Sequence, residues 1–494
     1  MSTLSISLTS LLRHLCHQGV RGDLSVTISQ IAEDSRRVCP GALFVAIPGT
    51  HHDGHRYIQA AISSGAVAVV GERADLDVPV TYILVENSRQ ALAEAAAAFY
   101  RFPTERLFTV GVTGTNGKTS TTTLAAAVLG ESQTALSNTV RNALERHCDL
   151  TTPSAIELQR LAYEALTSGK QHFVIEVSAH ALSQYRVHAI DFDVGVFTNL
   201  THDHLDYYGS MERYLQAKLL LFQYLRPSAT AIINGDDPYA THFIRATHAR
   251  VLTYGLGAHH DLWADEIVLH PTGSRFTVHT PAGLLPIETL LPGEFSVYNI
   301  LAAIAVGLVR GRSLEQIKQG IESVRAVPGR CERYTTRDGV HIVVDFAHSP
   351  DALERVLKML KRFYPRVICV FGCGGESDPY KRPIMGEISG RYADYTIITS
   401  DNPKREDPLA IIAQIEFGIR PLQAAYEAIA DRPQAILRAL ALARAGDCVL
   451  IAGKGHERTQ IFADREIPYN DSDFLRERGI ISQSPSSYAR ISSR

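Results

Sequence analysis

The sequence lacks a strong excess of either charge. Its 49 lysine and arginine residues are balanced by 52 aspartate and glutamate residues, which leaves a formal net charge of −3. Proteins that bind nucleic acid or anionic membranes usually carry a clear basic patch, and this composition gives no such indication. We therefore expect no nucleic-acid partner and no insertion into a membrane.

Long apolar runs are also absent. No segment approaches the ~20 apolar residues that a membrane-spanning helix needs. The first residues, Met1 to Leu8, show no basic start followed by a long apolar stretch, so no signal peptide is predicted. Together these absences predict a soluble protein of the cytoplasm.

Cysteine is scarce and scattered. The seven cysteines are odd in number, and the single close pair, Cys369 and Cys373, has no second pair to complete a metal site. Free thiols in a reducing compartment explain this pattern better than a disulfide framework does.

The length and the pattern of short apolar runs predict three domains of the α/β class. A chain of 494 residues corresponds to about three domains at ~150 residues each. Short apolar strands alternate with helical segments, and this alternation favours parallel sheets covered by helices. We expect an N-terminal mixed α/β domain, a central parallel-sheet domain with a phosphate loop and a C-terminal Rossmann-like domain, over residues 1–97, 98–329 and 330–494.

A glycine-rich loop near residue 115 is the most informative motif. It follows the apolar strand 107–110 and precedes a helix that ends before Gly130. A strand, a glycine loop, Lys118-Thr119 and a helix present backbone N–H groups to a polyphosphate. Lys118 would reach the outer phosphates and the Thr119 hydroxyl would bind Mg²⁺. The loop is a variant, because Val112 stands where the general pattern has glycine; the alternative is a purely structural turn.

Two further motifs follow strands of the central section. Glu176 ends a hydrophobic strand, where a carboxylate either binds a metal beside the phosphates or caps a helix. The segment 198–206 holds His202, Asp203, His204 and Asp206 directly after another strand. That density of ligating groups suits a site, and a solvated loop is the alternative.

Lys218 lies in a predicted helix over 211–225. Tyr214 and Phe222 stand one turn away on either side, so the lysine shares a partly apolar face. The residues alone favour a stem lying on that face with its ammonium group in water.

Four polar turns follow successive strands of the C-terminal section. They begin at Asp345, Gly372, Ser400 and Gly453. Any one could be an ordinary turn. Four of them at strand ends of one sheet instead indicate a ligand site, since ligands bind at the carboxyl ends of strands in open α/β sheets.

Taken together, these motifs resemble those of the Mur ligases of bacterial cell-wall synthesis, in particular the members that add the third amino acid. The resemblance covers nearly the whole chain in order. It rests on the segments 34–36, 48–54, 113–120, 151–153, 176–178, 203–206, 295–299, 328–330, 345–350, 401–404 and 453–457.

The resemblance implies a role for each domain and for named residues. The first domain would hold a uridine nucleotide, the second ATP and the third the incoming amino acid. The residues implied for the nucleotide-linked dipeptide UDP-MurNAc-L-Ala-D-Glu are Ser35, Thr50, His51, His52, Thr151, Thr152, Ser178, Gln184 and Arg186. Those implied for ATP are Thr113, Gly114, Thr115, Asn116, Gly117, Lys118, Thr119, Ser120, Asn299 and Arg330.

The same resemblance implies the catalytic and metal-binding residues. Lys118, His204 and Lys218 would be catalytic, and Mg²⁺ would be held by Thr119, Glu176, His204 and Lys218. Lys218 aligns with a lysine that the family carbamylates, which reverses the interpretation from its helix alone. The carbamate turns a cation into an anion that helps to position Mg²⁺ against the phosphates.

The implied reaction couples ATP cleavage to amide formation. The D-glutamate γ-carboxylate would attack ATP to give an acyl phosphate, which the amine of the amino acid would then displace. The residues implied for the amino acid are Ser377, Asp401, Asn402, Pro403, Lys404, Gly453 and Glu457.

Two of these residues bear on which amino acid is added. Members that add meso-diaminopimelate have arginine where this chain has Lys404, and usually also where it has Ser377. Lysine keeps the charge and loses the bidentate fork. An L-lysine-adding member would avoid a cation at 404, so we favour meso-diaminopimelate over L-lysine. Folylpolyglutamate synthesis and a nucleotide-binding regulator without chemistry are more distant alternatives. We expect a monomer.

Overall fold

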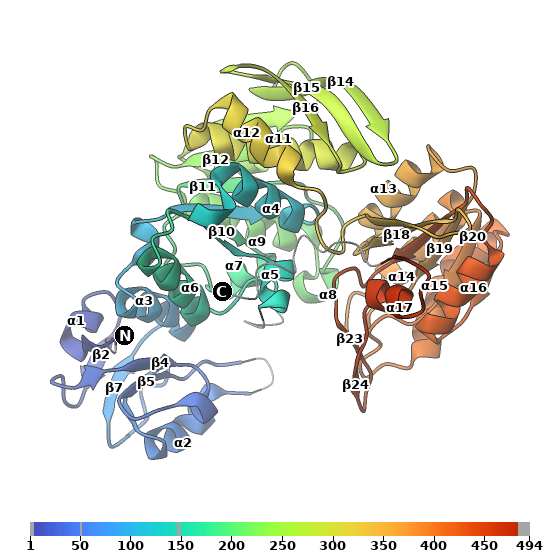
Figure 1. The fold of residues 1–494 in the computed structure, drawn as a ribbon. Helices are drawn as coiled ribbons and strands as arrows, with labels where there is room; N and C mark the ends of the chain where they lie inside the picture. The colour runs from blue at the N-terminus through green and yellow to red at the C-terminus, as the bar shows by residue number, and fades with distance from the viewer. Residues whose placement is uncertain (1–3, 50–51, 146–149, 483–494) are drawn as a thin grey trace.

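The computed structural model describes residues 4–49, 52–145 and 150–482, and it places them in three successive α/β units (Figure 1). Two of the residues implied for the nucleotide-linked dipeptide, Thr50 and His51, lie outside the described residues. Each unit has its own sheet, and the order of the units along the chain follows the colour change from blue to red in Figure 1.

The N-terminal unit is built on a five-stranded sheet of order β2-β7-β6-β5-β4, parallel except for β2. Its strands are β2 (Gly19–Arg21), β4 (Gln30–Ala32), β5 (Ala42–Val45), β6 (Ala66–Gly71) and β7 (Thr81–Leu84). The short strands β1 (Ile6–Ser7) and β3 (Thr27–Ile28) pair separately. The helices are α1 (Leu8–Leu12), α2 (Ile58–Ser63) and α3 (Ser88–Phe99). The expected limit at residue 97 therefore falls in the last turn of α3, which packs against α6 of the central unit.

The central unit has a nine-stranded sheet of order β16-β15-β14-β13-β12-β11-β8-β10-β9. The parallel strands are β8 (Phe108–Thr113), β9 (Thr134–Ser137), β10 (His172–Glu176), β11 (Val194–Phe197), β12 (Thr230–Asn234), β13 (Arg250–Gly255) and β14 (Leu262–His270). Strands β15 (Gly273–Thr280) and β16 (Gly283–Thr289) extend it antiparallel. The alternation of strand and helix predicted the parallel part; the antiparallel extension was not predicted.

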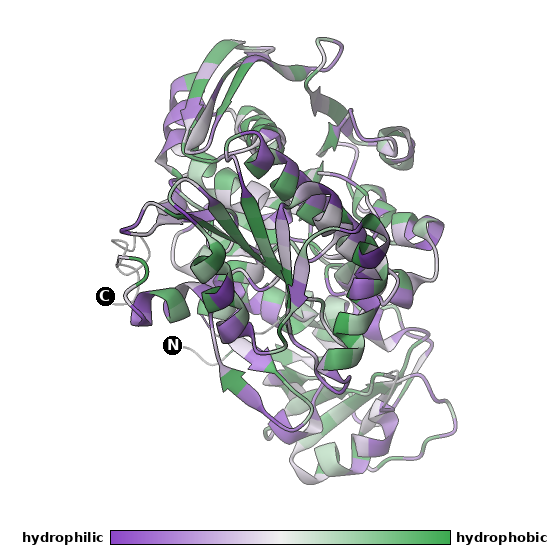
Figure 2. Ribbon diagram, turned by 90° about the vertical axis from the view of Figure 1, so that its right-hand side faces the viewer, coloured by the Kyte–Doolittle hydropathy of each residue, from purple (hydrophilic) through white to green (hydrophobic). Residues whose placement is uncertain are grey.

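Helices cover both faces of the central sheet and form two separate hydrophobic cores. On one face lie α4 (Lys118–Leu129), α11 (Glu294–Val309) and α12 (Leu314–Ser323). On the other lie α6 (Ala155–Thr167), α7 (Ala179–Ser183), α9 (Met211–Gln223) and α10 (Ala240–Ala246). The short helices α5 (Thr139–Leu144) and α8 (Leu205–Tyr208) follow β9 and β11. Because both faces are covered, the strands of the middle of the molecule are mainly hydrophobic (Figure 2).

The C-terminal unit has a six-stranded sheet of order β17-β18-β22-β19-β20-β21, parallel except for β17. Its strands are β17 (Glu332–Thr335), β18 (His341–Asp345), β19 (Val367–Phe371), β20 (Tyr395–Ile398), β21 (Tyr426–Ala428) and β22 (Cys448–Ala452). Its helices are α13 (Pro350–Lys361), α14 (Lys381–Tyr392), α15 (Pro408–Ile419), α16 (Arg432–Leu442) and α17 (Asp471–Glu477), and a hairpin joins β23 (Thr459–Ile461) to β24 (Glu466–Pro468). The four predicted strand–turn units are β18, β19, β20 and β22, so their polar turns share one edge of this sheet.

These three units confirm the predicted α/β class and three-domain architecture. Among the described residues, none of the helices combines the length and the apolar character needed to span a bilayer. The predicted elements agree with the observed ones to within one to three residues: the helix expected before Gly130, for example, is α4 and begins at Lys118.

A buried ion pair holds the C-terminal helix α17 on its sheet. Arg432 and Asp471 are both fully buried, and the guanidinium donates two hydrogen bonds of 2.8 Å to the carboxylate. Arg432 Nη2 also donates to the carbonyl of Ala452, the last residue of β22, at 3.0 Å. The pair therefore fixes the end of the strand that leads into the turn at 453–457.

Replacing Asp471 by alanine should leave this guanidinium buried without its counter-charge. We expect the free energy of unfolding to fall by about 3–5 kcal/mol, the usual cost of breaking a buried pair. Arg438→Ala, which removes a half-exposed pair with Glu427, is the control and should cost about 1 kcal/mol or less. Urea unfolding followed by circular dichroism measures both; equal losses would contradict the role given to the buried pair.

Candidate functional site

A cavity of about 840 Å³ lies between the central and C-terminal units. The central unit lines it with the glycine loop, with Glu176 and Ser178 after β10, and with residues 198–204 after β11. The C-terminal unit contributes Asp345 to His348 and one side of α13. The carboxyl edges of two sheets thus face each other across one cavity, as expected for ligand sites in open α/β sheets.

The glycine loop joins β8 to α4 by a turn that depends on two glycines. Gly114 has a φ of 151°, and a Cβ there would lie 1.9 Å from the Thr198 hydroxyl. Gly117 has a φ of 85° and caps α4, and a Cβ there would lie 2.4 Å from Asn299 Oδ1. The loop is therefore pressed against the turn after β11 on one side and against α11 on the other.

Lys118 begins α4 and folds its side chain over this loop. Its Nζ donates to the carbonyl oxygens of Gly114 at 3.0 Å and of Thr115 at 2.8 Å. Burial lowers the pKa of Lys118, while the Glu176 and Asp203 carboxylates oppose that shift. A lysine at this place, with the N-terminus of a twelve-residue helix beside it, is suited to bind a polyphosphate.

Glu176 is a buried carboxylate at the centre of the site. Its Oε2 accepts hydrogen bonds from Thr119 Oγ1 at 2.9 Å and from the N–H and hydroxyl of Thr139, both at 3.0 Å. Arg330, from the start of the C-terminal unit, donates to Thr119 Oγ1 at 3.2 Å. A carboxylate and a threonine hydroxyl in contact beside a phosphate loop form a donor set of oxygen atoms, which is the set that Mg²⁺ prefers.

The segment after β11 brings Asp203 and His204 to the same cavity. Burial opposes ionisation of Asp203, yet Lys381 and His204 hold its pKa well below the usual range. Burial lowers the pKa of His204 to about 3, assisted by the cations around it. His204 is therefore a neutral imidazole at pH 7, the form that binds a metal ion. Its backbone has a φ of 55°, a strained value that the surrounding contacts must hold.

Lys218 is buried, which contradicts the interpretation that its ammonium group lies in water. Only 1 % of the residue is exposed, and its Nζ donates to the carbonyl of Gly114 at 2.8 Å. The same nitrogen lies 4.4 Å from the centre of the Tyr214 ring. Burial and the neighbouring Lys118 place the pKa of Lys218 well below its ordinary value. A buried lysine amine that is easily deprotonated is a nucleophile able to take up CO₂.

The residues implied for the dipeptide fall into one connected cluster and two separate positions. Thr152 Oγ1 donates to the carbonyl of Glu176 at 2.7 Å and lies 3.3 Å from the Ser178 hydroxyl. Arg186 donates to the carbonyl of Thr152 at 2.9 Å and to the side chain of Gln184 at 2.6 Å. Thr151, Ser178 and Arg186 line the cavity, whereas Ser35 and His52 lie in the N-terminal unit and do not line it.

The residues implied for the amino acid form a second cluster in the C-terminal unit. Lys454 is fully buried and donates to Asn402 Oδ1 and to Glu457 Oε2, both at 2.8 Å. The side-chain amide of Asn402 donates in turn to Glu457 at 2.8 Å, and the backbone carbonyl of Asn402 accepts from the Gly375 N–H at 2.8 Å, in the turn that carries Ser377. Gly453 packs against Asp401, whose carboxylate would lie 2.5 Å from a Cβ there.

This second cluster does not line the 840 Å³ cavity. Phe346 and His456 stand between the two, with ring centres 4.9 Å apart, and the guanidinium of Arg330 lies 4.4 Å from the Phe346 ring centre. Lys404 has a φ of 52°, and its N–H donates to the carbonyl of Ile461 at 3.0 Å, so the hairpin β23–β24 holds its backbone.

Polar contacts other than that of Arg330 with Thr119 also join the central unit to the C-terminal unit around the cavity. Asn116 of the glycine loop donates to Asp351 at 2.9 Å, His202 lies 3.0 Å from Asp378, and the Asp203 carboxylate lies 3.8 Å from Lys381. The sequence analysis did not assign a role to Asp351, Asp378, Lys381 or Lys454. Lys454 carries a local signal, since a glycine flanks it on each side directly after a strand; the other three become recognisable only when the two units meet.

Family models match most of the chain. The Mur ligase family, catalytic domain matches residues 27–100, the Mur ligase middle domain residues 112–307, and the Mur ligase, glutamate ligase domain residues 329–455. The chain belongs to the Mur ligase family. The matched ranges follow the three structural units, and the middle-domain match begins in β8 and includes the glycine loop, Glu176, His204 and Lys218.

Relatives match over nearly the full length. The chain is 43% identical over 490 residues to the UDP-N-acetylmuramoyl-L-alanyl-D-glutamate--2,6-diaminopimelate ligase of Geobacillus kaustophilus, covering 96% of this chain and 100% of that one. It is 41% identical over 477 residues to the ligase of the same name from Caldanaerobacter subterraneus, covering 95% and 98%. A solved structure of a ligase of that name superposes with a TM-score of 0.67 at 31% identity, over 96% and 98% of the two chains.

Replacing Gly117 by alanine should disturb the loop through Asn299. The new Cβ would collide with Asn299 Oδ1, so we expect both lower stability and a KM for ATP raised about tenfold, which corresponds to ~1.4 kcal/mol. Gly169→Ala is the matched control, because Gly169 has a similar φ of 80° and nothing within 4 Å of the added Cβ.

The Gly169→Ala control should lose only about 1–2 kcal/mol of stability, the cost of a left-handed backbone conformation for a residue with a Cβ, and it should keep the wild-type KM for ATP. Steady-state kinetics and thermal unfolding of both variants measure the difference. An unchanged KM in the Gly117 variant would show that the contact with α11 does not shape the nucleotide site.

Proposed function

We propose that this protein is an ATP-dependent ligase that joins meso-diaminopimelate to the D-glutamate γ-carboxylate of UDP-MurNAc-L-Ala-D-Glu, a step of peptidoglycan synthesis. The observation that carries the proposal is the meeting of the glycine loop, Glu176 and His204 in one cavity, with the buried Lys218 bonded to Gly114 of that loop. The full-length relatives that share 41–43% of the sequence bear the name of this ligase. We place the reaction in the cytoplasm, where ATP is available, and propose that the protein acts as a monomer.

The arrangement of the site fits Mg²⁺ and ATP. Thr119, Glu176, His204 and a carbamate on Lys218 would hold Mg²⁺, which would supply positive charge against the negative charge that develops on the phosphates. Lys118, the N–H groups of residues 113–120, Asn299 and Arg330 would bind the nucleotide. The oxygen donors Thr119 and Glu176, already in contact, support this assignment.

Two steps account for the chemistry. First, an oxygen of the γ-carboxylate attacks the γ-phosphorus of ATP, the bond to the β,γ-bridging oxygen breaks, and ADP leaves with an acyl phosphate formed. Then the amine nitrogen attacks the acyl carbon, inorganic phosphate departs, and the nitrogen loses a proton. Thr152, Ser178 and Arg186 would position the carboxylate, and Lys118 would stabilise the charge on the transferred phosphoryl group.

The proposed amino-acid site has charges for a substrate with two charged ends. Glu457 and Asp401 would bind an ammonium group, and Lys404 would bind the distal carboxylate that L-lysine lacks. Burial raises the pKa of Glu457, and a nearby ammonium group would favour its ionised form. Ser377 offers a hydroxyl where the ligases that add meso-diaminopimelate usually have a second cation. Lys404 would therefore be the residue that distinguishes meso-diaminopimelate from L-lysine. L-lysine is the second candidate substrate, favoured by the loss of both arginines.

Folylpolyglutamate synthesis is disfavoured by the first unit. Residues 27–100 match a Mur ligase family model. That unit precedes the central unit in the chain and contains a complete five-stranded sheet. A regulator without chemistry would have no need for Lys118 together with the buried Glu176 and Lys218.

An amino-acid panel tests the proposed reaction. Purified protein is incubated with UDP-MurNAc-L-Ala-D-Glu, ATP, Mg²⁺ and either meso-diaminopimelate or L-lysine, and phosphate release and the tripeptide product are measured. We expect turnover with meso-diaminopimelate. If neither amino acid gave phosphate release, the proposed ligase activity would be refuted. A preference for L-lysine would refute the proposed choice of meso-diaminopimelate.

The variants Lys404→Ala and Lys404→Arg test whether Lys404 distinguishes meso-diaminopimelate from L-lysine. Because a hydrogen bond to a charged group contributes about 1.5–3 kcal/mol, Lys404→Ala should raise the KM for meso-diaminopimelate by about 10–100-fold and leave any use of L-lysine unchanged. Lys404→Arg should retain the wild-type KM within a few-fold. Equal effects on both amino acids would place the distal carboxylate elsewhere.

Lys218→Ala tests the carbamate. We expect loss of turnover by about 10²-fold or more, since a group that places charge at the phosphates is removed. Labelled bicarbonate should give a carbamate carbon signal by NMR in the wild type that is absent from this variant. A normal rate, or the same signal in both proteins, would refute the assignment.

A further inference from the structure

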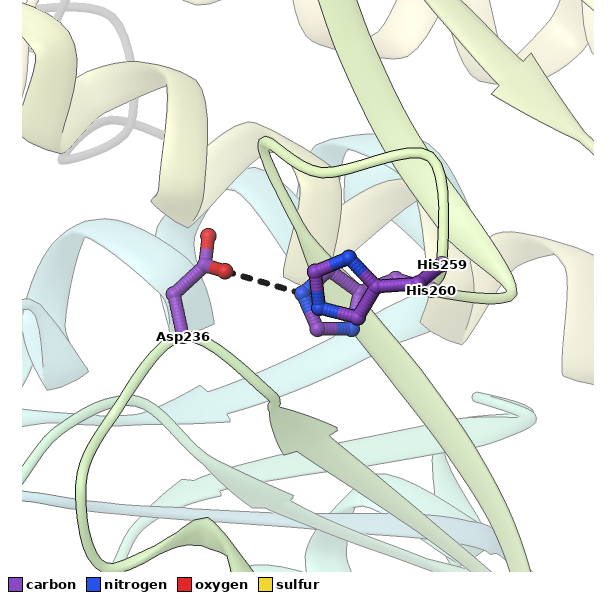
Figure 3. A group of neighbouring side chains, drawn as sticks. All are labelled: Asp236, His259 and His260. Carbon is purple, nitrogen blue, oxygen red and sulfur yellow. Dashed lines mark hydrogen bonds and ion pairs between the residues drawn. The ribbon is translucent and has the colours of Figure 1, made fainter.

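A cluster of two histidines and one aspartate lies beside the cavity, which only its aspartate lines. Asp236 follows β12, and His259 and His260 lie in the loop between β13 and β14 (Figure 3). One ligand atom from each side chain lies within 4.8 Å of the other two. His260 Nε2 and Asp236 Oδ1 are 2.8 Å apart, and the two imidazole ring centres are separated by 3.9 Å.

The backbone around His260 is shaped to admit its ring. A Cβ on Gly235 would lie 2.3 Å from His260 Cε1, and one on Gly255 would lie 2.4 Å from His260 Cδ2. The ring therefore fills a slot between the ends of β12 and β13 that any other residue at either glycine would close. Only 5 % of the His260 side chain is exposed, so the ring is held in place rather than solvated.

The carboxylate of Asp236 is oriented by two donors that are independent of the histidines. The Leu256 N–H donates to Asp236 Oδ2 at 2.7 Å, and the Tyr298 hydroxyl, from α11, donates to the same oxygen at 2.9 Å. Oδ1 is thereby directed toward His260. Outer contacts that hold a carboxylate in this way are a regular feature of metal sites.

We propose that Asp236, His259 and His260 form a binding site for a first-row transition-metal ion, of which Zn²⁺ is the natural example. Two imidazoles and one carboxylate, with water in a fourth position, are a donor set that Zn²⁺ accepts. Mg²⁺ prefers oxygen donors, so this set selects against the cation proposed at Glu176. A metal between Nε2 and Oδ1 replaces the proton that these atoms now share.

The location gives the site a structural consequence. Asp236 and Tyr298 both line the 840 Å³ cavity, and Tyr298 precedes Asn299 on α11. A bound ion would link the loop that carries the two histidines to the end of β12 and, through Tyr298, to α11. The inference rests on this cluster alone and does not depend on the proposed ligase activity.

Metal binding to protein without nucleotide tests the inference. Tag-free, chelator-stripped protein is titrated with Zn²⁺ by calorimetry and with Co²⁺ by visible absorption, both in excess Mg²⁺. We expect a site that Mg²⁺ does not block and a Co²⁺ spectrum typical of four-coordinate nitrogen and oxygen ligands. A bound ion should also raise the temperature of thermal unfolding.

The variants separate this site from other zinc-binding groups. Because the thiols of Cys16 and Cys39 are exposed and can also bind zinc, the site is measured as the difference between wild type and His259→Ala. His259 is exposed, so this variant should fold, and its affinity should fall by about tenfold or more. Asp236→Asn, which keeps the side-chain shape, should show a similar loss. His270→Ala, at an exposed histidine ending β14, is the matched control and should bind as the wild type does.

Two results would overturn the inference. One is equal Zn²⁺ stoichiometry and affinity in the wild type and the His259 variant. The other is a Co²⁺ spectrum in the wild type that is unchanged by either the His259 or the Asp236 substitution. Neither measurement depends on whether Lys218→Ala loses ligase activity. The metal-site proposal and the ligase proposal can therefore be refuted independently of each other.

Discussion

Two lysines, of which Lys218 is buried, share one carbonyl oxygen, and the site is organised around that contact. Lys118 and Lys218, a hundred residues apart in the chain, both donate to Gly114, at 3.0 and 2.8 Å. Their positive charges repel each other, and Glu176 and Asp203 offset that repulsion only in part. Additional negative charge at this place is therefore stabilised, whether it comes from phosphate oxygens or from a carbamate on Lys218. The repulsion between the two ammonium groups destabilises the protein without a ligand, and it is relieved when an anionic ligand binds.

That contact constrains the backbone around it. Gly114 has a φ of 151°, and the turn after β11 lies too close for any side chain there. Asn199 and Thr198 bond to the loop from that turn, at 2.9 and 2.7 Å. The position of His204, a few residues further along, is thus coupled to the position of the phosphate loop.

Polar contacts join the two units that face the cavity, and Phe295 of α11 packs against the hydrophobic core of the C-terminal unit. Asn116, His202 and Asp203 bond to Asp351, Asp378 and Lys381. Interfaces of this kind between domains are compatible with relative motion of the domains. The Lys381 contact is also electrostatic support for Asp203, because it holds the pKa of that carboxyl low. The unit that carries the proposed amino-acid site is accordingly coupled to the charge balance at the phosphate loop.

The sequence by itself determined the strands, the glycine loop and the polar turns. Apolar runs that end in Glu176, Asn234 or Asp345 are local patterns, and parallel strands necessarily bring such ends to one edge of a sheet. It also indicated the family, through motifs spread along the chain. The antiparallel strands β15 and β16 were not predicted, although Pro271-Thr272-Gly273 and Pro281-Ala282-Gly283, where they begin, contain residues typical of turns.

Only the tertiary structure decided the environment of Lys218, the contacts across the cavity and the cluster of Asp236 with His259 and His260. A lysine on a partly apolar helical face is normally solvated, and its burial here follows from packing against a loop a hundred residues away. The aspartate and the two histidines likewise come together because β12 and β13 are neighbours in the sheet. Burial, charge and metal-ligating geometry arise between distant segments, and no local pattern encodes them.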